Sequence, residues 1–198
     1  MQNLAYNLLP QAPATEHFAG GRVKGSMVQA HIDWVRTHRD RGEVIAFFES
    51  IPPAMRSVAP SMWVPFQQMI ELDRIAVSEF GKGDIAFMQE LGAYSARQNL
   101  TGVFRLFQRA DVHGFFRRSA QLHNRFHDFG SAAYEELSAN EGQLIHRGYL
   151  SYSPLYCASA IGFYHECIRL HGGTNVAVWE STCQCRGDET CTFELLWS

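Results

Sequence analysis

Apolar residues recur at helical spacing through the first two thirds of the chain and alternate with polar residues in the last third. Residues 1–22 contain two prolines and a glycine pair without a sustained period, so we predict a mobile tail there. Ser26 is predicted to cap a first helix that reaches about Arg39. A short second helix from Glu43 to Glu49 should stop at the Pro52-Pro53 pair.

Further helices are predicted up to about residue 129. Pro65 suits the first turn of a helix that ends at Gly81-Lys82-Gly83, and Asp84 should cap the next helix. From Thr101 to Phe129 the spacing stays helical, with a break near Ala110–Gly114. In this last stretch phenylalanines interleave with arginines.

The period then changes to that of strands. Asn140-Glu141-Gly142 has the composition of a hairpin turn, and Ser153-Pro154 should open a helix. The predicted strands are residues 134–137, 143–149, 176–183 and 190–197. The expected fold class is therefore α+β: N-terminal helices followed by a β-β-α-β-β unit with an antiparallel sheet, as a single domain over residues 23–198.

Composition narrows the protein class. The chain has 198 residues, 46% hydrophobic and 13% aromatic, which is enough for one well-packed domain. A net charge of −3 gives no general attraction to nucleic acid or to an anionic membrane, and no apolar run approaches the roughly 20 residues of a membrane helix. The N-terminus lacks the pattern of a secretory signal, so we expect a cytoplasmic protein with reduced cysteines.

All five cysteines lie between residues 157 and 191. Cys157, Glu180, Cys183 and Cys191 come from three consecutive predicted elements, which a zinc ion bound by thiolates and one carboxylate could hold together. The alternative is a cysteine-rich piece of core, because a free cysteine behaves as a small hydrophobic residue. Glu180 and Cys183 are three residues apart and would point to opposite faces of a regular strand, so a shared site needs a bulge or a strand end near Ser181-Thr182.

A family resemblance appears in the same region. The pattern Cys157-x22-Glu180-x2-Cys183-x7-Cys191, with the ending Gly187-Asp188-x-x-Cys191-x-Phe193, resembles the 4-vinyl-reductase type of ligand-binding domain. In the phenol-sensing regulators of that group, the matching cysteines and glutamate bind a structural zinc. The resemblance therefore implies a zinc ligand set of Cys157, Glu180, Cys183 and Cys191.

A longer stretch, from about Gly21 to Trp197, resembles more closely a family of paralogous myxobacterial proteins. The segments that carry this resemblance are Val23-Lys24-Gly25-Ser26, Trp63-Val64-Pro65-Phe66, 100–107 and Arg186-Gly187-Asp188. Vinyl-reductase-type domains are related in fold to TRAPP-complex subunits and to haem nitric-oxide sensors. The resemblance implies a fold and a sensing or scaffolding role, without a particular ligand.

The phenylalanine-rich helices suggest a pocket for a small apolar ligand. Its predicted walls are Phe104, Phe107, Phe126 and Phe129, with His123 and Tyr134 as the residues that orient the ligand. The alternative is that these phenylalanines are plain core. The neighbouring arginines are interpreted as a solvated face, and no nucleic-acid partner is expected.

Haem and catalysis are not expected. The haem sensors hold the propionates with a Tyr-x-Ser-x-Arg motif, and Tyr94-Ser95-Ala96-Arg97 is one residue too short to match it. The chain has no glycine-rich phosphate loop, no Gly-x-Ser-x-Gly elbow and no His-Glu-x-x-His motif. An accessory role in tetrapyrrole reduction would rest on the family name alone.

Two functions remain as hypotheses. The first is a non-catalytic sensory module that binds a small apolar ligand, holds a structural zinc and signals through a partner protein. The second is a TRAPP-like scaffold with a solid interior that works as a homodimer or docks another protein, because aromatic residues and arginine mix over Phe115–Phe129 as they do at interfaces.

Overall fold

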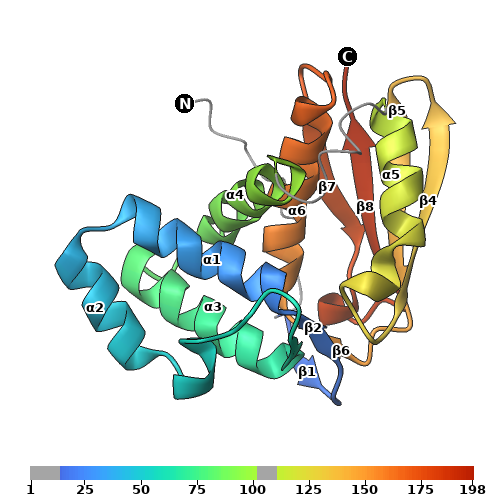
Figure 1. The fold of residues 1–198 in the computed structure, drawn as a ribbon. Coiled ribbons are helices and arrows are strands. Elements are labelled where there is room, and N and C mark those ends of the chain that lie inside the picture. The colour runs from blue at the N-terminus through green and yellow to red at the C-terminus, as the bar shows by residue number, and fades with distance from the viewer. Residues whose placement is uncertain (1–13, 102–110) are drawn as a thin grey trace.

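The computed structural model describes residues 14–101 and 111–198 and shows a helical half beside a four-stranded sheet (Figure 1). The elements of the N-terminal half are β1 (His17–Phe18), β2 (Arg22–Lys24), α1 (Gly25–His38), α2 (Arg41–Ser50), η1 (Pro53–Met55), β3 (Trp63–Pro65), α3 (Phe66–Phe80) and α4 (Phe87–Thr101). The elements of the C-terminal half are α5 (Val112–Gln121), η3 (His123–Arg125), β4 (Ser131–Ser138), β5 (Glu141–Arg147), β6 (Ser151–Tyr152), α6 (Pro154–Leu170), β7 (Ala177–Thr182), η4 (Gln184–Arg186) and β8 (Cys191–Leu196). The α+β class and the β-β-α-β-β unit are confirmed.

Helix ends follow the local capping chemistry. Asp40 and Glu43 form a capping box, in which the Asp40 carboxylate accepts from the Glu43 amide at 2.9 Å and the Glu43 carboxylate accepts from the Asp40 amide at 3.1 Å. The prediction that Ser26 caps α1 is wrong, because the helix already begins at Gly25 and no side chain caps it. At the start of α6, Ser153 accepts from the Leu155 amide at 3.3 Å and Pro154 occupies the first turn, as predicted.

The predicted helix that should continue to Phe129 is shorter in the structure. Among the described residues, Asp111 caps α5, whose start falls in the predicted break, and the helix ends at Gln121. A 3₁₀ turn and an extended segment then lead to β4, so His123 and Phe126 lie on an irregular turn. Only one side of this turn is covered, because His123 is buried while Asn124 and Arg125 are exposed.

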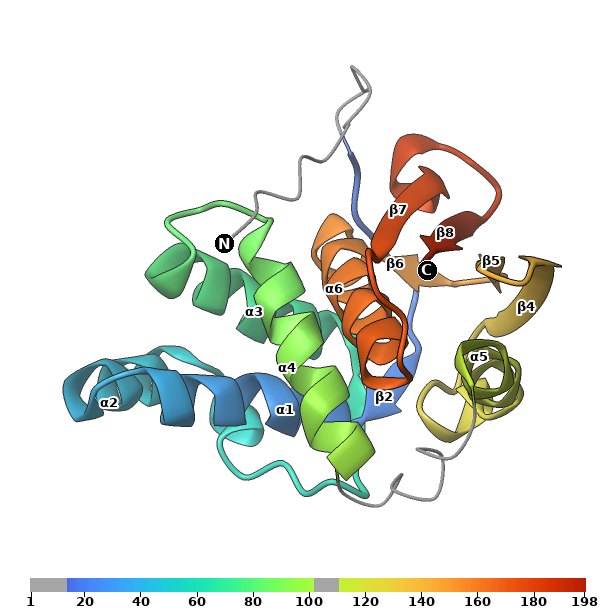
Figure 2. The same cartoon turned by 90° about the horizontal axis from the view of Figure 1, so that it is seen from above.

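The main sheet has the strand order β4-β5-β8-β7, and all its pairs are antiparallel. One face packs against α6, which returns across the sheet between the two hairpins (Figure 1). Helix α4 packs closely along α6 and joins the sheet half to helices α1–α3, as the view from above shows (Figure 2).

Two glycines permit the close crossing of α4 and α6. A Cβ added at Gly162 would lie 2.6 Å from the Cα and carbonyl carbon of Gln89, and one added at Gly92 would lie 2.8 Å from the carbonyl carbon of Ser159. Real Cβ atoms essentially never approach another atom so closely. The backbones of the two helices therefore touch directly at this crossing.

The start of the described chain is part of the fold. Strand β1 pairs with β6, and β2 pairs with β3, both antiparallel. The prediction of a mobile tail is therefore wrong for His17–Phe18 and for Arg22. The apolar pattern of this stretch is too short to reveal strands of two or three residues.

The buried side chains form two clusters. One lies among α1, α2, α3 and the first part of α4, and the other lies among α5, α6 and the sheet. Within the described residues, no helix has the length and apolar character needed to cross a membrane.

Candidate metal centre and ligand cavity

Four predicted metal ligands meet where α6, β7 and β8 converge. Cys157 lies in the first turns of α6, Glu180 lies on β7, and Cys191 begins β8. Ser181 is an extra residue in β7, because Glu180 pairs with Phe193 while Thr182 already pairs with Thr192. This is the bulge that the spacing of Glu180 and Cys183 required, and it turns both side chains to one site.

The geometry of this cysteine–glutamate cluster suits a tetrahedral ion. One ligand atom from each of the four residues lies within 4.8 Å of all the others. The Cys183 sulfur is 3.7 Å from that of Cys157 and 4.0 Å from that of Cys191. Two sulfurs bound to one tetrahedral zinc at about 2.3 Å would lie roughly 3.8 Å apart. The three thiols are buried, and all five cysteines of the chain are free.

Groups around the cluster hold its ligands in place. The Asp188 carboxylate accepts from the Cys183 amide at 2.7 Å, and the Gln184 amide donates to the Cys191 sulfur at 3.3 Å. In known metal sites, hydrogen bonds from neighbouring groups to the ligating residues orient those residues. The turn closes at Gly187, whose φ of 97° is a conformation that favours glycine.

The carboxylate of Glu180 is largely buried, and its charge and hydrogen-bonding capacity are only partly satisfied. The Arg186 guanidinium lies 3.5 Å from Oε2, while Oε1 has no hydrogen-bond partner among the described residues. Burial, and then the nearby Cys183 sulfur, raise the pKa of Glu180 to about 8. The Cys183 thiolate accepts hydrogen bonds from the other thiols, and this lowers the pKa of Cys183 and raises that of Cys157. A buried acidic set of this kind has the donor chemistry of a soft divalent cation site.

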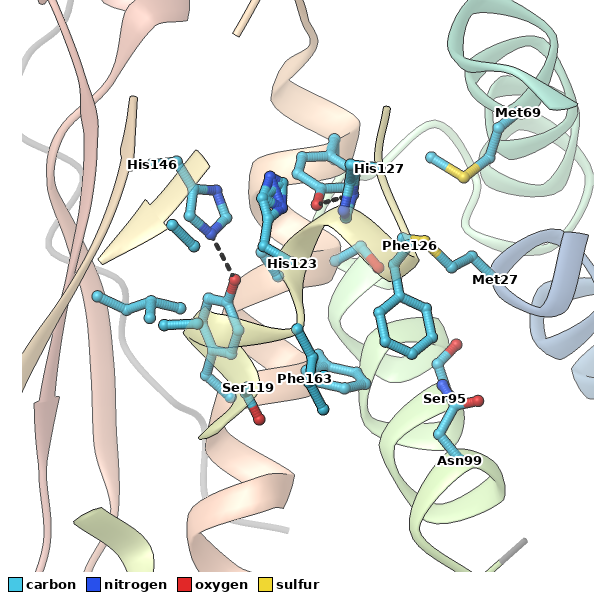
Figure 3. A pocket seen from close by; sticks show the side chains of 18 of the residues that line it. Met27, Met69, Ser95, Asn99, Ser119, His123, Phe126, His127, His146 and Phe163 are labelled. Atoms are coloured by element: carbon cyan, nitrogen blue, oxygen red, sulfur yellow. Dashed lines mark hydrogen bonds between the residues drawn. The ribbon is translucent and has the colours of Figure 1, made fainter. Parts of the chain in front are cut away.

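A partly open cavity of about 180 Å³ lies at the seam of the two core clusters, lined by residues of α1, α3, α4, α5, α6, η3 and β5. An engineered cavity of about 150 Å³ in another protein holds one benzene molecule. Figure 3 shows Phe126 and Phe163 on the cavity wall together with His123, His127 and His146. Most of the wall's surface is apolar, so the space suits a compact, mostly apolar molecule. The other polar residues on the wall are His31, Asp73, Ser95, Asn99, Ser119 and Ser159.

Three histidine–tyrosine pairs form one polar part of the wall. His123 Nε2 lies 3.2 Å from the Tyr149 hydroxyl. The equivalent pairs, His127 with Tyr156 at 2.8 Å and His146 with Tyr164 at 2.9 Å, are drawn as dashed lines in Figure 3. All of these groups line the same cavity.

Burial keeps these groups uncharged near neutral pH. It lowers the pKa of His146 to about 3 and lowers the pKa values of His127 and His123, and it raises the pKa values of Tyr149 and Tyr164. Uncharged imidazoles and phenols can each donate and accept hydrogen bonds. These pairs are therefore matched to an uncharged ligand.

Some polar atoms beside the cavity have no partner among residues 14–101 and 111–198. They are His127 Nδ1, Ser95 Oγ and Asp73 Oδ2. The other Asp73 oxygen lies 2.6 Å from His31 Nδ1 in a buried pair. Buried polar atoms without partners are uncommon, and here they border a space that can admit another molecule.

The structure brings together some of the predicted ligand-binding residues and separates others. His123 and Phe126 line the cavity. Phe129 lies in the core against Phe66, outside the cavity wall. Tyr134 faces a second, shallow depression, where its hydroxyl lies 2.6 Å from His113 Nδ1. The remaining two predicted residues, Phe104 and Phe107, lie outside the described residues.

The scaffold hypothesis assumed an exposed aromatic interface and a solid interior, and the structure supports neither. Phe115, Phe116 and Phe129 are buried, so the aromatic residues of this stretch do not form an exposed interface. The interior also contains the cavity instead of being solid. Dimerisation stays a prediction.

Sequence reasoning missed most of the polar cavity wall. His127, His146 and their tyrosine partners come from three different segments, namely the stretch after η3, strand β5 and helix α6. The four-residue spacing of His123 and His127 was the only local signal, because it places two side chains on one side of a helical turn.

Comparison with known proteins shows the fold. Neither a family model nor a curated protein matches the sequence. Solved structures of H-NOX haem nitric-oxide/oxygen-binding domains are similar. An H-NOX protein from S. oneidensis in the Fe(II)NO ligation state has a TM-score of 0.72 at 12% identity, over 88% of this chain and 99% of that chain. An oxygen-binding H-NOX domain related to soluble guanylate cyclases has a TM-score of 0.69 at 12% identity, over 88% of this chain and 95% of that chain.

The cavity is small for the haem of the H-NOX family. A porphyrin contains four pyrrole rings, whereas the cavity is close in size to a space that holds one benzene ring. Arg97 is the residue that comes nearest in the sequence to the arginine of the propionate-binding motif. Its guanidinium forms an ion pair with the Glu166 carboxylate at 3.3 Å. Three of the four histidines on the described wall engage tyrosines through Nε2, and the fourth, His31, pairs with Asp73. The chain therefore has an H-NOX-like fold around a cavity of a different kind, and its likeness to vinyl-reductase-type domains stays a prediction.

Proposed function

We propose that this chain is a non-catalytic sensory module that binds a small, uncharged, mostly apolar molecule in the cavity between its two core clusters. The observation that carries the proposal is a mostly apolar cavity of about 180 Å³ whose polar groups include three histidine–tyrosine pairs. A ligand there would contact α4, α5, α6 and the sheet at once, and it would change their packing. The signal would then pass to a partner protein.

A structural zinc ion is the second part of the proposal. Cys157, Glu180, Cys183 and Cys191 supply three sulfurs and one carboxylate oxygen, the spacing of the sulfurs matches a tetrahedral ion, and Glu180 Oε1 has no other partner in the described residues. Four protein ligands leave no open position for catalysis. The ion would fix the start of α6 to both strands of the last hairpin.

Ligand binding can be tested with phenol and toluene as one-ring probes, by calorimetry and by the shift in thermal unfolding. A ligand that binds only the folded state stabilises it by an amount that rises with its concentration. Ala160→Phe places a ring in the cavity and should abolish both signals. Ala46→Phe adds the same ring on the exposed side of α2 and should leave them intact. Equal binding by wild type and Ala160→Phe, or no binding of either probe, would count against the cavity as the binding site.

Zinc can be tested by elemental analysis of protein purified without added metal. Wild type should carry about one zinc per chain, and Cys183→Ser should lose it together with several degrees of thermal stability. Cys167→Ser alters another buried cysteine, one that lies outside the cluster, and should keep the metal. Metal-free wild type would leave the cluster as a packed group of thiols.

A further inference from the structure

A second set of polar side chains faces the cavity from the helical half of the fold. Ser95 and Asn99 lie on α4, and Asp73 lies on α3. The histidine–tyrosine pairs come from the other half, after the end of α5. In Figure 3, Phe126 lies between Ser95 and Asn99 on one side and His123 on the other. The cavity therefore has a polar group at each end and an apolar middle.

The Ser95 hydroxyl has no hydrogen-bond partner although it lies inside a helix. The residue is 6% exposed, and its Oγ makes no hydrogen bond within the two described stretches of the chain. A serine in the middle of a helix ordinarily points to solvent or donates to the carbonyl four residues earlier. Ser95 does neither, so its hydroxyl is available to a molecule in the cavity.

Two neighbouring groups extend this polar end. Asn99 follows Ser95 by one helical turn, on the same side of α4. Asp73 is fully buried; its Oδ1 lies 2.6 Å from His31 Nδ1, and its Oδ2 has no partner in the described chain. A serine hydroxyl and an asparagine amide can each donate and accept a hydrogen bond. The set therefore suits a ligand group that does both, such as a hydroxyl.

We propose that the cavity takes an uncharged ring with a polar group at each end, and that Ser95 and Asn99 bind the second group while the histidine–tyrosine pairs bind the first. The inference rests on the proposed function of the cavity and narrows the class of its ligand. A ring with a single polar group would leave the α4 side chains unpaired beside an apolar surface, which native structures rarely allow.

Hydroquinone and 4-methylphenol test this directly, because they differ only by a hydroxyl or a methyl group at one end of the same ring. Against an apolar wall the extra buried hydroxyl would weaken binding roughly fivefold to 150-fold. With partners on α4, hydroquinone should bind wild type at least as tightly as 4-methylphenol. Both affinities can be measured by calorimetry without oxygen, so that hydroquinone stays reduced.

Two variants assign the effect to α4. Ser95→Ala and Asn99→Leu should each weaken hydroquinone binding roughly twofold to tenfold, the value of one hydrogen bond, and should leave 4-methylphenol binding intact. Ser119→Ala is the matched control, because it removes a hydroxyl from the part of the wall that α5 supplies. It should leave the affinities for both compounds unchanged.

The outcomes separate this inference from the proposed function. Weaker binding of hydroquinone than of 4-methylphenol by wild type, or unchanged hydroquinone binding in both α4 variants, would overturn the second polar end and leave the cavity as a binding site. An equal loss in Ser119→Ala would also overturn it. Binding of neither compound by wild type would overturn the proposed function as well. The wild-type comparison needs no substitution, so it decides even where a variant does not fold.

Discussion

Substitution of Gly162 by alanine should separate the two helices on which both candidate sites depend. The new methyl group would lie 2.6 Å from backbone atoms of Gln89, roughly 0.8 Å inside the 3.4 Å at which ordinary contact begins. Backbone atoms cannot rotate away, so α4 must move. Overpacking of this kind costs about 1–3 kcal/mol.

Alanine also has the higher helix propensity, which offsets up to about 1 kcal/mol of that cost. We therefore expect Gly162→Ala to lower the free energy of unfolding by about 1–2 kcal/mol. For a chain of this length, that corresponds to a fall in melting temperature of about 2–8 °C.

The assay is urea-induced unfolding followed by circular dichroism, with Gly42→Ala as the matched control. Gly42 lies on the exposed side of α2, where the new methyl group would meet only the Asp40 carboxylate at 3.3 Å. That variant should be unchanged or up to about 1 kcal/mol more stable, since the unfolded chain loses freedom. If both variants had the same stability, the close backbone contact between α4 and α6 would be refuted.

Two further predictions concern pH and capping. Burial lowers the pKa of His127 in the folded state, so the uncharged imidazole stabilises the fold fully above the unfolded-state pKa of about 6.5. Below that pH the free energy of unfolding falls, by up to about 1.4 kcal/mol per pH unit for this one residue. His127→Gln should reduce that slope in urea titrations across this range, and an unchanged slope would contradict the burial of an uncharged imidazole. Asp40→Ala should cost about 1 kcal/mol because it removes the capping box, while Ser26→Ala, at the position where a cap was predicted, should cost close to nothing in the same assay. The reverse order would contradict the helix ends described above.

Local spacing was enough to predict the order of elements and one detail of the metal centre. Apolar periods of about 3.6 and 2 follow from which side of an element is buried, so the helices and both hairpins appear in the sequence. The three-residue separation of Glu180 and Cys183 demanded an irregularity near Ser181-Thr182, and the structure has the bulge at Ser181. Here the requirement that Glu180 and Cys183 reach one site predicted a backbone irregularity between them.

The cavity could not be predicted in the same way. Its polar wall combines side chains from α6, β5, η3 and the loop after β5, and their proximity depends on how these elements pack. Phe129 and Phe126 look alike in the sequence, yet one fills the core and the other borders the cavity. The periodicity of a phenylalanine stripe shows which residues are buried and does not show whether the space beside them is filled.

Helix α6 carries two neighbouring residues that serve different sites. Tyr156 pairs with His127 at the cavity, and the next residue, Cys157, belongs to the metal centre. Across the sheet, His146 of the cavity is paired in register with Cys191 of the metal centre. If the proposed zinc ion and ligand affect each other through these neighbouring residues, the coupling must be reciprocal. If bound zinc raises the affinity for the ligand by some factor, the bound ligand raises the affinity for zinc by the same factor. In the proposed sensory module, the ambient zinc concentration would then set the ligand concentration at which the module responds.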